Sequence, residues 1–229
     1  MERNLREPYS EDEIDMEQLI LVDSNDNQIG YEEKVKCHLP DGKLHRAFTI
    51  LLFDKEGRLL LTQRSMSKML WPGDWDGTVA SHPRQSETYV SSAERRLPEE
   101  LGLSCKLDYL FKFEYHVPYK NIGSENEVCG TLIGIVDDPG KIKLVKDEIS
   151  TIKWVTLEQL VSEIDKSPEI FCPWMLVALY FLPESNNKVS ERHRKILEVW
   201  SSGSSNNKKH LEKSLKYHFP NNTWGLKKE

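Results

Sequence analysis

The sequence contains 229 residues, has a formal net charge of -6 and has an isoelectric point near 5.7. A chain of this length can bury one substantial hydrophobic core with appendages, and its acidic balance argues against general binding to nucleic acid. No apolar run approaches the ~20 residues of a membrane span, and the four cysteines lack paired spacing, which is typical of reduced thiols. We therefore predict a cytoplasmic protein without a nucleic-acid or membrane partner.

The first part of the chain is predicted to form β-hairpins after a polar lead-in at residues 1–16. The segment 19–34 has two apolar stretches around a turn at 25–27, which is typical of a hairpin. The segment 45–65 repeats this pattern with longer strands. The continuous apolar run at 49–53 favours a strand that is buried on both faces.

Beyond residue 103, further strands are followed by helices. Apolar patterns predict three strands, at 109–117, 126–136 and 147–155. They then predict two helices, at 156–167 and 172–182. Thr156 is the expected cap of the first of these helices. Because strands lie on both sides of a central helical segment, we predict an α/β fold in which a mixed β-sheet is packed between helices, over residues 17–183.

The composition changes in the last segment, residues 184–229. One more helix is expected at 192–200, followed by a Ser/Asn-rich linker at 201–209 and a basic, aromatic tail at 210–229. We predict a loosely packed helical extension. A tail that docks on a partner or mediates self-association is the alternative, and the oligomeric state is left open.

The central stretch, residues 71–103, is rich in turns and then enters a charged helix. Residues three or four apart share a helical face, so Arg96 is expected beside Glu100. Carboxylates hold Mg²⁺, whose other ligands are water and phosphate oxygens, and arginine binds the same oxygens through its planar fork. On charge alone, a solvated helix with intrahelical ion pairs is the favoured interpretation. The charged side chains in question are Glu87, Arg95, Arg96, Glu99 and Glu100.

Three histidines and two glutamates form a candidate metal site. His38, His45 and His82 fall near predicted strand ends or loops, and Glu125 and Glu127 alternate along one strand and so face the same side. Imidazoles with carboxylates suit a divalent ion such as Mn²⁺, Zn²⁺ or Mg²⁺. A single histidine of this kind is usually structural, so the hypothesis depends on the fold to bring the five together.

The segment 87–103 resembles the Nudix box, whose pattern is Gly, five residues, Glu, seven residues, Arg-Glu-apolar-any-Glu-Glu-any-Gly-apolar. The residues that fit the pattern are Glu87, Arg95, Leu97, Glu99, Glu100, Gly102 and Leu103. Ser81 stands where the pattern has Gly, and Arg96 stands where it has Glu. The resemblance implies a Nudix-type layered fold.

A more specific resemblance covers residues 17–183. The order of several short motifs is similar to that in the type 1 isopentenyl-diphosphate isomerases. In chain order these motifs are His38, His45, WPG, SHP, RR with ELG, ENEVC and PW. These isomerases are Nudix-fold enzymes that interconvert isopentenyl and dimethylallyl diphosphate. The resemblance implies a small isoprenoid diphosphate as substrate and two divalent ions. One ion would be held by His38, His45, His82, Glu125 and Glu127. The other would be a Mg²⁺ held by Glu100 together with the substrate.

The resemblance also implies roles in binding and proton transfer. Trp174 would lay its indole against the isoprenoid carbons, while Glu127 and Tyr115 would serve proton transfer. These roles fit the chemistry, because moving a double bond by protonation passes through a carbocation that water would capture and an aromatic face would stabilise. The cationic clamp on the phosphates would be Lys34, Arg64, Lys68 and Arg96.

The sequence departs from this family at Ala80, where the isomerases have a cysteine that acts as acid and base opposite the glutamate. The run 75–78, WDGT, also differs from an Asn-containing run of the family. A water, Ser81 or Tyr115 is a candidate replacement for the thiol, and Cys37 and Cys129 are expected to neighbour proposed ligands.

Three hypotheses follow from these departures. The first is an isomerase with a replaced thiol. The second is a Nudix hydrolase that cleaves a diphosphate linkage in a nucleotide or isoprenoid compound. The third is a catalytically silent diphosphate-binding protein, or one in which the alanine was introduced deliberately. Arg96 argues against the hydrolase, because it replaces a glutamate of the hydrolytic metal cluster. We therefore predict the isomerase.

Overall fold

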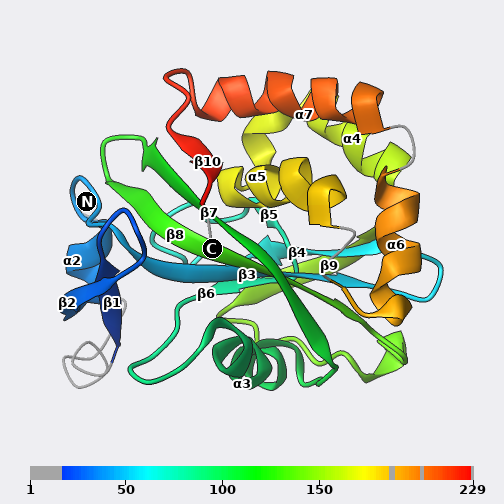
Figure 1. The fold of residues 1–229 in the computed structure, drawn as a ribbon, viewed down its shortest axis with the longest axis horizontal. Coiled ribbons are helices and arrows are strands. Elements are labelled where there is room, and N and C mark those ends of the chain that lie inside the picture. Colours follow the sequence, from blue (N-terminus) through cyan, green and yellow to red (C-terminus); the bar gives the residue numbers. More distant parts are fainter. Residues whose placement is uncertain (1–16, 186–188, 202–203, 228–229) are drawn as a thin grey trace, which may run out of the picture.

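The computed structural model describes residues 17–185, 189–201 and 204–227. The predicted lead-in at residues 1–16 lies outside the described residues. A mixed β-sheet crosses the molecule, with α3 on one face and α4, α5 and α7 on the other (Figure 1). This layered arrangement confirms the predicted fold class. None of the helices in the described ranges is both long and apolar enough to span a membrane.

Within the described ranges ten strands form the sheet, and their central order is β10-β7-β8-β3-β1-β2. The pair β3–β8 is parallel, whereas the other strand pairs are antiparallel. The strands are β1 (Gln18–Val22), β2 (Gln28–Glu33), β3 (His45–Phe53), β4 (Leu59–Arg64), β5 (Trp75–Asp76), β6 (Val79–Ser81), β7 (Leu107–Tyr119), β8 (Gly123–Ile135), β9 (Ile149–Val155) and β10 (Trp224–Leu226).

The helices cover both faces of this sheet. They are α2 (Lys34–His38), α3 (Tyr89–Leu101), α4 (Leu157–Lys166), α5 (Pro173–Phe181), α6 (Glu191–Ser201) and α7 (Ser204–His218). Three short 3-10 turns lie at Pro139–Lys141, Pro168–Ile170 and Leu182–Ser185.

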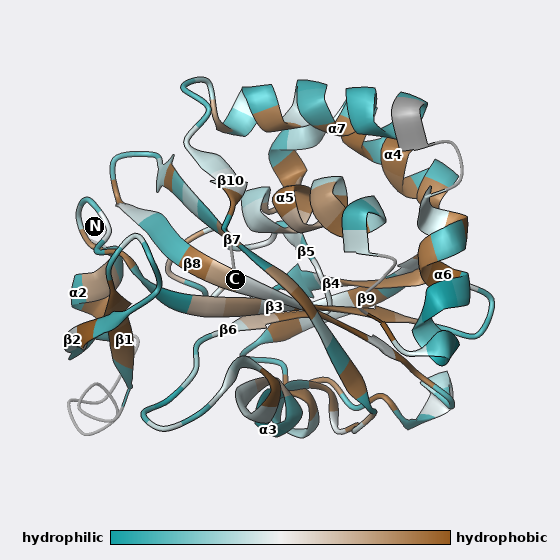
Figure 2. Ribbon diagram, in the orientation of Figure 1, coloured by the Kyte–Doolittle hydropathy of each residue, from teal (hydrophilic) through white to brown (hydrophobic). Residues whose placement is uncertain are grey.

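Strand β3 lies at the centre of the core. Its residues from Ala47 to Phe53 are all buried, which confirms the predicted burial on both faces. Alternate residues of β3 pack into two hydrophobic clusters, one on each face of the sheet, because successive side chains of a strand point to opposite faces. Phe48 and Ile50 pack with α3, whereas Ala47 and Leu51 pack with α5. In Figure 2, β3 and α5 are coloured mostly as hydrophobic, whereas α7 carries many hydrophilic residues. The hydrophobic core thus lies between the sheet and the helices that cover it.

Two hairpins form, at β1–β2 as predicted and at β7–β8. The two strands and the turn predicted at residues 45–65 also form, but the antiparallel pairing of β3 with β4 is limited to Phe53 and Leu59 beside the turn. The hydroxyl of Thr78 lies between the two strands: it accepts a hydrogen bond from Leu52 N and donates one to Leu60 O. The hydroxyl thereby binds backbone N–H and C=O groups that would otherwise pair β3 with β4. Strand β4 pairs instead with β5 and β9.

The helix ends follow capping chemistry. Thr156 caps α4 in a capping box with Gln159, which confirms the predicted cap. Thr88 caps α3 with Ser91 in the same manner. Helix α3 ends at Gly102, whose φ of 64° is a left-handed conformation that glycine adopts at low cost. These caps fix where the charged helix begins and ends beside the sheet.

The C-terminal segment differs from the prediction of a Ser/Asn-rich linker and a loose tail. Residues from Ser204 onward are helical, and α7 packs against α4 and α5. Leu211, Leu215 and Phe219 are buried in the same core as α5, and β10 adds to the sheet by pairing with β7. The prediction was wrong because tertiary packing of an apolar stripe, spaced four residues apart, outweighs the weak helix propensity of Ser and Asn.

Replacing Phe219 by alanine tests this packing. Phe219→Ala is expected to lower the free energy of unfolding by about 3–5 kcal/mol, because the ring is 1% exposed and truncation leaves a cavity. Tyr217→Ala is the matched control, since this ring is 60% exposed and its loss should change stability by less than about 0.5 kcal/mol. Urea unfolding measures both, and equal effects would contradict the packing described here.

Candidate active site

One pocket gathers most of the predicted site residues, and its lining includes Arg96 of α3 and Trp174 of α5. It is also lined by Ala47, Ala80 and Cys129, which lie on neighbouring strands. Two predicted residues, His45 and Glu100, are buried behind this lining. The predicted residues that line the pocket are Lys34, His38, Arg64, Lys68, His82, Arg96, Tyr115, Glu125, Glu127 and Trp174.

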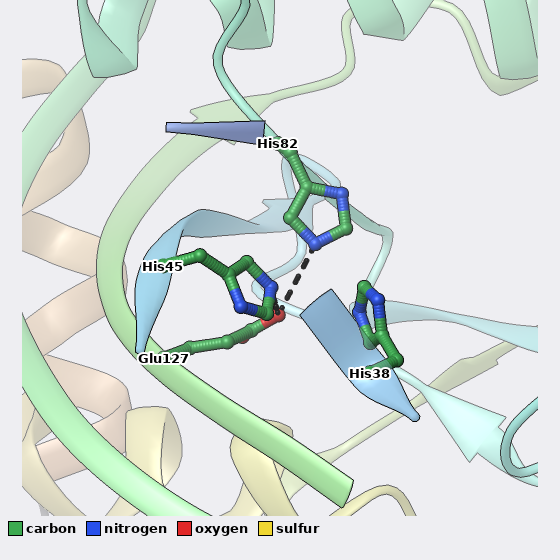
Figure 3. A group of neighbouring side chains, drawn as sticks. All are labelled: His38, His45, His82 and Glu127. Carbon is green, nitrogen blue, oxygen red and sulfur yellow. Dashed lines mark hydrogen bonds and ion pairs between the residues drawn. The ribbon is translucent and has the colours of Figure 1, made fainter. Parts of the chain in front are cut away.

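Three imidazoles and one carboxylate converge on one another, as Figure 3 shows. His38 ends α2, His45 begins β3, His82 follows β6 and Glu127 lies in β8. Each offers a ligand atom, and these atoms lie within 4.8 Å of one another. Glu125 is not part of this group, but its Oε2 lies 3.0 Å from Nε2 of His38.

Hydrogen bonds to the backbone turn two imidazoles toward a common centre. Nδ1 of His38 is 2.6 Å from Lys34 O, and Nδ1 of His45 is 2.7 Å from Lys43 O. A carbonyl oxygen only accepts, so both Nδ1 atoms carry the proton, and a neutral ring then presents its Nε2 lone pair to the centre. Histidines that ligate metals are held in this way.

The donor atoms of the group fit a divalent ion. Nε2 of His45 is buried and makes no hydrogen bond of good geometry among the described residues, although Oε1 of Glu127 lies 3.4 Å away. Burial is the main cause that lowers the pKa of His82 well below its usual value, so this ring is neutral. Imidazole nitrogens with carboxylate oxygens are donors for divalent metals, and leaving buried polar atoms unpaired is costly.

Tyr115 and Glu127 form a hydrogen-bonded pair in the pocket. The Tyr115 hydroxyl donates to Oε2 of Glu127 over 2.5 Å. Burial and the negative charge of Glu127 raise the pKa of Tyr115 well above its usual value, so the phenol stays protonated. Burial alone would raise the pKa of Glu127, but His45 and Tyr115 outweigh it and hold this pKa below the usual value. The pair therefore places a protonated donor beside a carboxylate.

The cationic side chains of the pocket are paired with acids. Lys34 binds Glu17 over 2.8 Å, whereas Lys68 and Arg96 both bind Glu148. Burial would raise the pKa of Glu148, but the two cations outweigh it and lower the pKa to about 2. Sequence reasoning missed both acids, because their partners are distant in the chain. The carboxylates of Glu17 and Glu148 therefore occupy the cations to which the family resemblance assigns the diphosphate.

Glu100 lies beneath Arg96, 2.7 Å from its guanidinium, as the helical spacing predicts. Burial raises the pKa of Glu100 to about 7, although Arg96 opposes this shift. Arg95 is directed elsewhere and binds Glu87 and Glu99. One side of α3 therefore presents Arg96 to the pocket, and the other side carries the ion pairs of Arg95.

The alanine that replaces the family's cysteine, and the two cysteines expected near proposed ligands, can also be located in the structure. Ala80 lies in β6 opposite Thr49 of β3 and faces the pocket. Of the two cysteines expected near proposed ligands, Cys129 lines the pocket, whereas Cys37 does not. Burial raises the pKa of the Cys129 thiol well above its usual value, so this thiol stays protonated.

Comparison with known proteins gives consistent results. The NUDIX domain family matches residues 43–175. Proteins named isopentenyl-diphosphate Delta-isomerase from Haloarcula marismortui and Serratia proteamaculans are each 39% identical to this chain, over 71% of its length and 89% of theirs. The crystal structure of DR0079 from Deinococcus radiodurans has the same fold, with a TM-score of 0.55, 23% identity and coverage of 66% of this chain and 90% of that chain.

Removing one imidazole tests the metal centre. His45→Ala is expected to weaken binding of Mn²⁺ or Zn²⁺ by about 100-fold or more, because even the loss of an outer hydrogen bond to a ligand costs 10- to 100-fold. His116→Ala is the control, since this exposed imidazole lies outside the group and bonds to Asp41 O. Titration calorimetry on metal-free protein measures both, and equal affinities would refute the proposed centre.

Neutralising Glu148 tests the paired cations. Its folded pKa of about 2 lies below the usual 4.5, so the ion pairs stabilise the fold above about pH 4.5 and this stability is lost as the pH falls toward 2. Glu148→Gln should lower stability at pH 7 by about 1–2 kcal/mol, and the difference from wild type should shrink below pH 4.5. The same variant should bind pyrophosphate about 10-fold more tightly, because a competing anion is gone.

The exposed Glu94 of α3 supplies the control for this variant. Glu94→Gln should leave pyrophosphate affinity unchanged and alter stability by less than about 0.5 kcal/mol. Acid unfolding curves and pyrophosphate titrations measure both properties. A Glu148→Gln variant that keeps the full acid sensitivity of the wild type would contradict the pairing.

Proposed function

Because the chain belongs to the isopentenyl-diphosphate Delta-isomerases of the NUDIX domain family, we propose that its pocket interconverts isopentenyl and dimethylallyl diphosphate. The observation that supports this most directly is the meeting of three kinds of group in one pocket. These are paired cations, a carboxylate with a protonated phenol, and a buried indole. Each kind answers one requirement of moving a double bond in a small diphosphate.

The reaction shifts one carbon–carbon double bond by two proton transfers. The π electrons of isopentenyl diphosphate take a proton at the terminal carbon, and a tertiary cation forms at the central carbon. Loss of a proton from the carbon next to the diphosphate-bearing carbon then supplies the electron pair of the new double bond. The Tyr115–Glu127 pair is proposed to serve proton transfer on one face of the substrate.

The cation must be shielded from water and stabilised. Trp174 is 3% exposed and lines the pocket, so its indole offers an aromatic face away from solvent. Leu70 and Ala47 add apolar surface to the same pocket. A sealed apolar wall protects a reactive intermediate from capture by water.

The diphosphate is proposed to bind to Lys34, Lys68 and Arg96 in exchange for the carboxylates that occupy them. Exchanging one anion for another avoids leaving a half-buried cation unpaired. This binding energy is remote from the reacting carbons and holds them in position for proton transfer. Arg64, also predicted as part of the clamp, lines the same pocket beside Trp174.

Two divalent ions are proposed to complete the pocket. Mg²⁺ that enters with the diphosphate would be held by Glu100, and a Mn²⁺, Zn²⁺ or Mg²⁺ would be held by His38, His45, His82 and Glu127, with Glu125 beside His38. When bound, these ions supply positive charge that neutralises the phosphates and orders the carboxylates. The partner that the proposal requires is thus a small isoprenoid diphosphate.

The hydrolase alternative has less support. Arg96 occupies the place of a Nudix-box glutamate and binds Glu99, Glu100 and Glu148 through its guanidinium. A cation at this position removes one carboxylate from the metal cluster that Nudix hydrolysis requires and adds a positive charge beside the carboxylates that remain.

Turnover in deuterated water tests the proposed function. Protein loaded with Mg²⁺ and incubated with isopentenyl diphosphate should form dimethylallyl diphosphate and incorporate deuterium, as followed by NMR. Release of phosphate would instead indicate hydrolysis, and binding without turnover would indicate a silent homologue. Either of these results would overturn the isomerase proposal.

Restoring a thiol tests the role of position 80. Ala80→Cys is expected to raise kcat by about 10-fold or more, because a positioned acid or base typically contributes 10²–10⁴-fold. Ala80→Val is the control, since it adds similar bulk without a transferable proton. Isomerase rates measure both variants, and an unchanged rate in Ala80→Cys would place the missing acid or base elsewhere.

A further inference from the structure

Asp76 of β5 has no part in the proposed reaction, yet it is a buried carboxylate with an exposed fraction of 3%. Its Oδ1 accepts hydrogen bonds from Nε1–H of Trp174, over 2.8 Å, and from Gly77 N, over 2.7 Å. Its Oδ2 accepts from Nη1 of Arg64 over 3.2 Å. Burial raises the pKa of Asp76, whereas these three donors, one of them charged, oppose that shift and favour the ionised carboxylate.

Arg64 is held directly over the ring that Asp76 binds. Its guanidinium carbon lies 5.1 Å from the centre of the Trp174 ring. Nε of Arg64 donates to Trp71 O over 3.0 Å, and Nη2 donates to Leu70 O over 2.9 Å. The Trp71 ring itself meets Trp174 at 85° with centres 5.3 Å apart. The indole is therefore fixed through its N–H, by a cation and by a second ring.

This arrangement poses an electrostatic problem for the reaction. A carbocation beside Trp174 would share the ring with the positive charge of Arg64, and like charges this close repel strongly in a water-poor pocket. The Asp76 carboxylate opposes that repulsion, because it pairs with Arg64 and accepts the indole proton. A hydrogen bond from the indole N–H to an anion also increases the electron density of the ring, which strengthens its attraction for a cation.

We propose that Asp76 is a positioning residue that fixes Trp174 and neutralises Arg64, so that the indole face stabilises the cation formed during isomerisation. The inference rests on the proposed function, because it assumes that positive charge develops beside Trp174. It assigns Asp76 an electrostatic role through two other side chains, without contact to the substrate.

Two diphosphates of equal size distinguish this role from simple structural support. One is the saturated isopentyl diphosphate, and the other has a tertiary ammonium in place of the carbon that becomes cationic. In the metal-loaded full chain, Asp76→Asn should weaken binding of the ammonium compound by about 10-fold and change binding of the saturated compound by less than about 3-fold. The same variant should lower kcat more than it changes KM, because the affected interaction strengthens as charge develops.

Asp54→Asn is the matched control, because it removes another buried aspartate that pairs with an arginine, Arg58, and that does not line the pocket. It should keep the preference of the wild type for the ammonium compound. If Asp76→Asn does not fold, Asp76→Thr, which has similar volume and keeps an oxygen acceptor, is measured in its place. An equal loss of affinity for both compounds, or an unchanged preference, overturns the proposal.

The binding comparison also separates this inference from the proposed function. A wild-type protein that forms no dimethylallyl diphosphate contradicts the isomerase proposal, whatever Asp76 does. A wild-type protein that isomerises its substrate but shows no preference for the ammonium compound contradicts the role of Asp76 alone.

Discussion

The parallel pairing of β3 with β8 is the constraint on which the candidate site depends. Its register sets His45 opposite Glu127 and Ala47 opposite Cys129. A slip of one residue would turn these side chains to the other face of the sheet, because strand side chains alternate. The register is strongly specified, since β3 is buried from Ala47 to Phe53 and a slip would exchange its two apolar faces. Packing of the core thus determines where a metal ligand meets the proton-transfer carboxylate.

Charge pairing is the second feature that the pocket requires. Cations that await a diphosphate would be costly to bury alone, and here Lys34 is bound by Glu17 while Lys68 and Arg96 share Glu148. Arg64 is neutralised in the same way by Asp76. The fold therefore tolerates a strongly cationic pocket before substrate binds, and the proposed substrate exchanges for Glu17 and Glu148, whereas Asp76 stays with Arg64. The apolar wall beside Trp174 can then stay closed to water.

The sequence predicted the order of strands and helices well, because apolar patterns and the Thr156 cap are local signals. It also identified the histidines, but their convergence depends on the pairing of positions 45 and 127 in the sheet and on the placement of α2, so only the family resemblance suggested it. Asp76 and Glu148 were missed, since their partners come from distant elements. Helix α7 was missed because its composition suggests a linker, whereas the apolar spacing that packs it against α5 is sparse.

The central claim is that one pocket holds a diphosphate at its cations and the isoprenoid carbons beside Trp174. A crystal structure of the metal-loaded protein with isopentenyl diphosphate, with anomalous scattering to locate the metal, tests this most directly. The account predicts an ion bound by His38, His45, His82 and Glu127, phosphates at Lys68 and Arg96, and carbons against the indole. A diphosphate bound outside this pocket, or imidazoles without a shared ion, would contradict it.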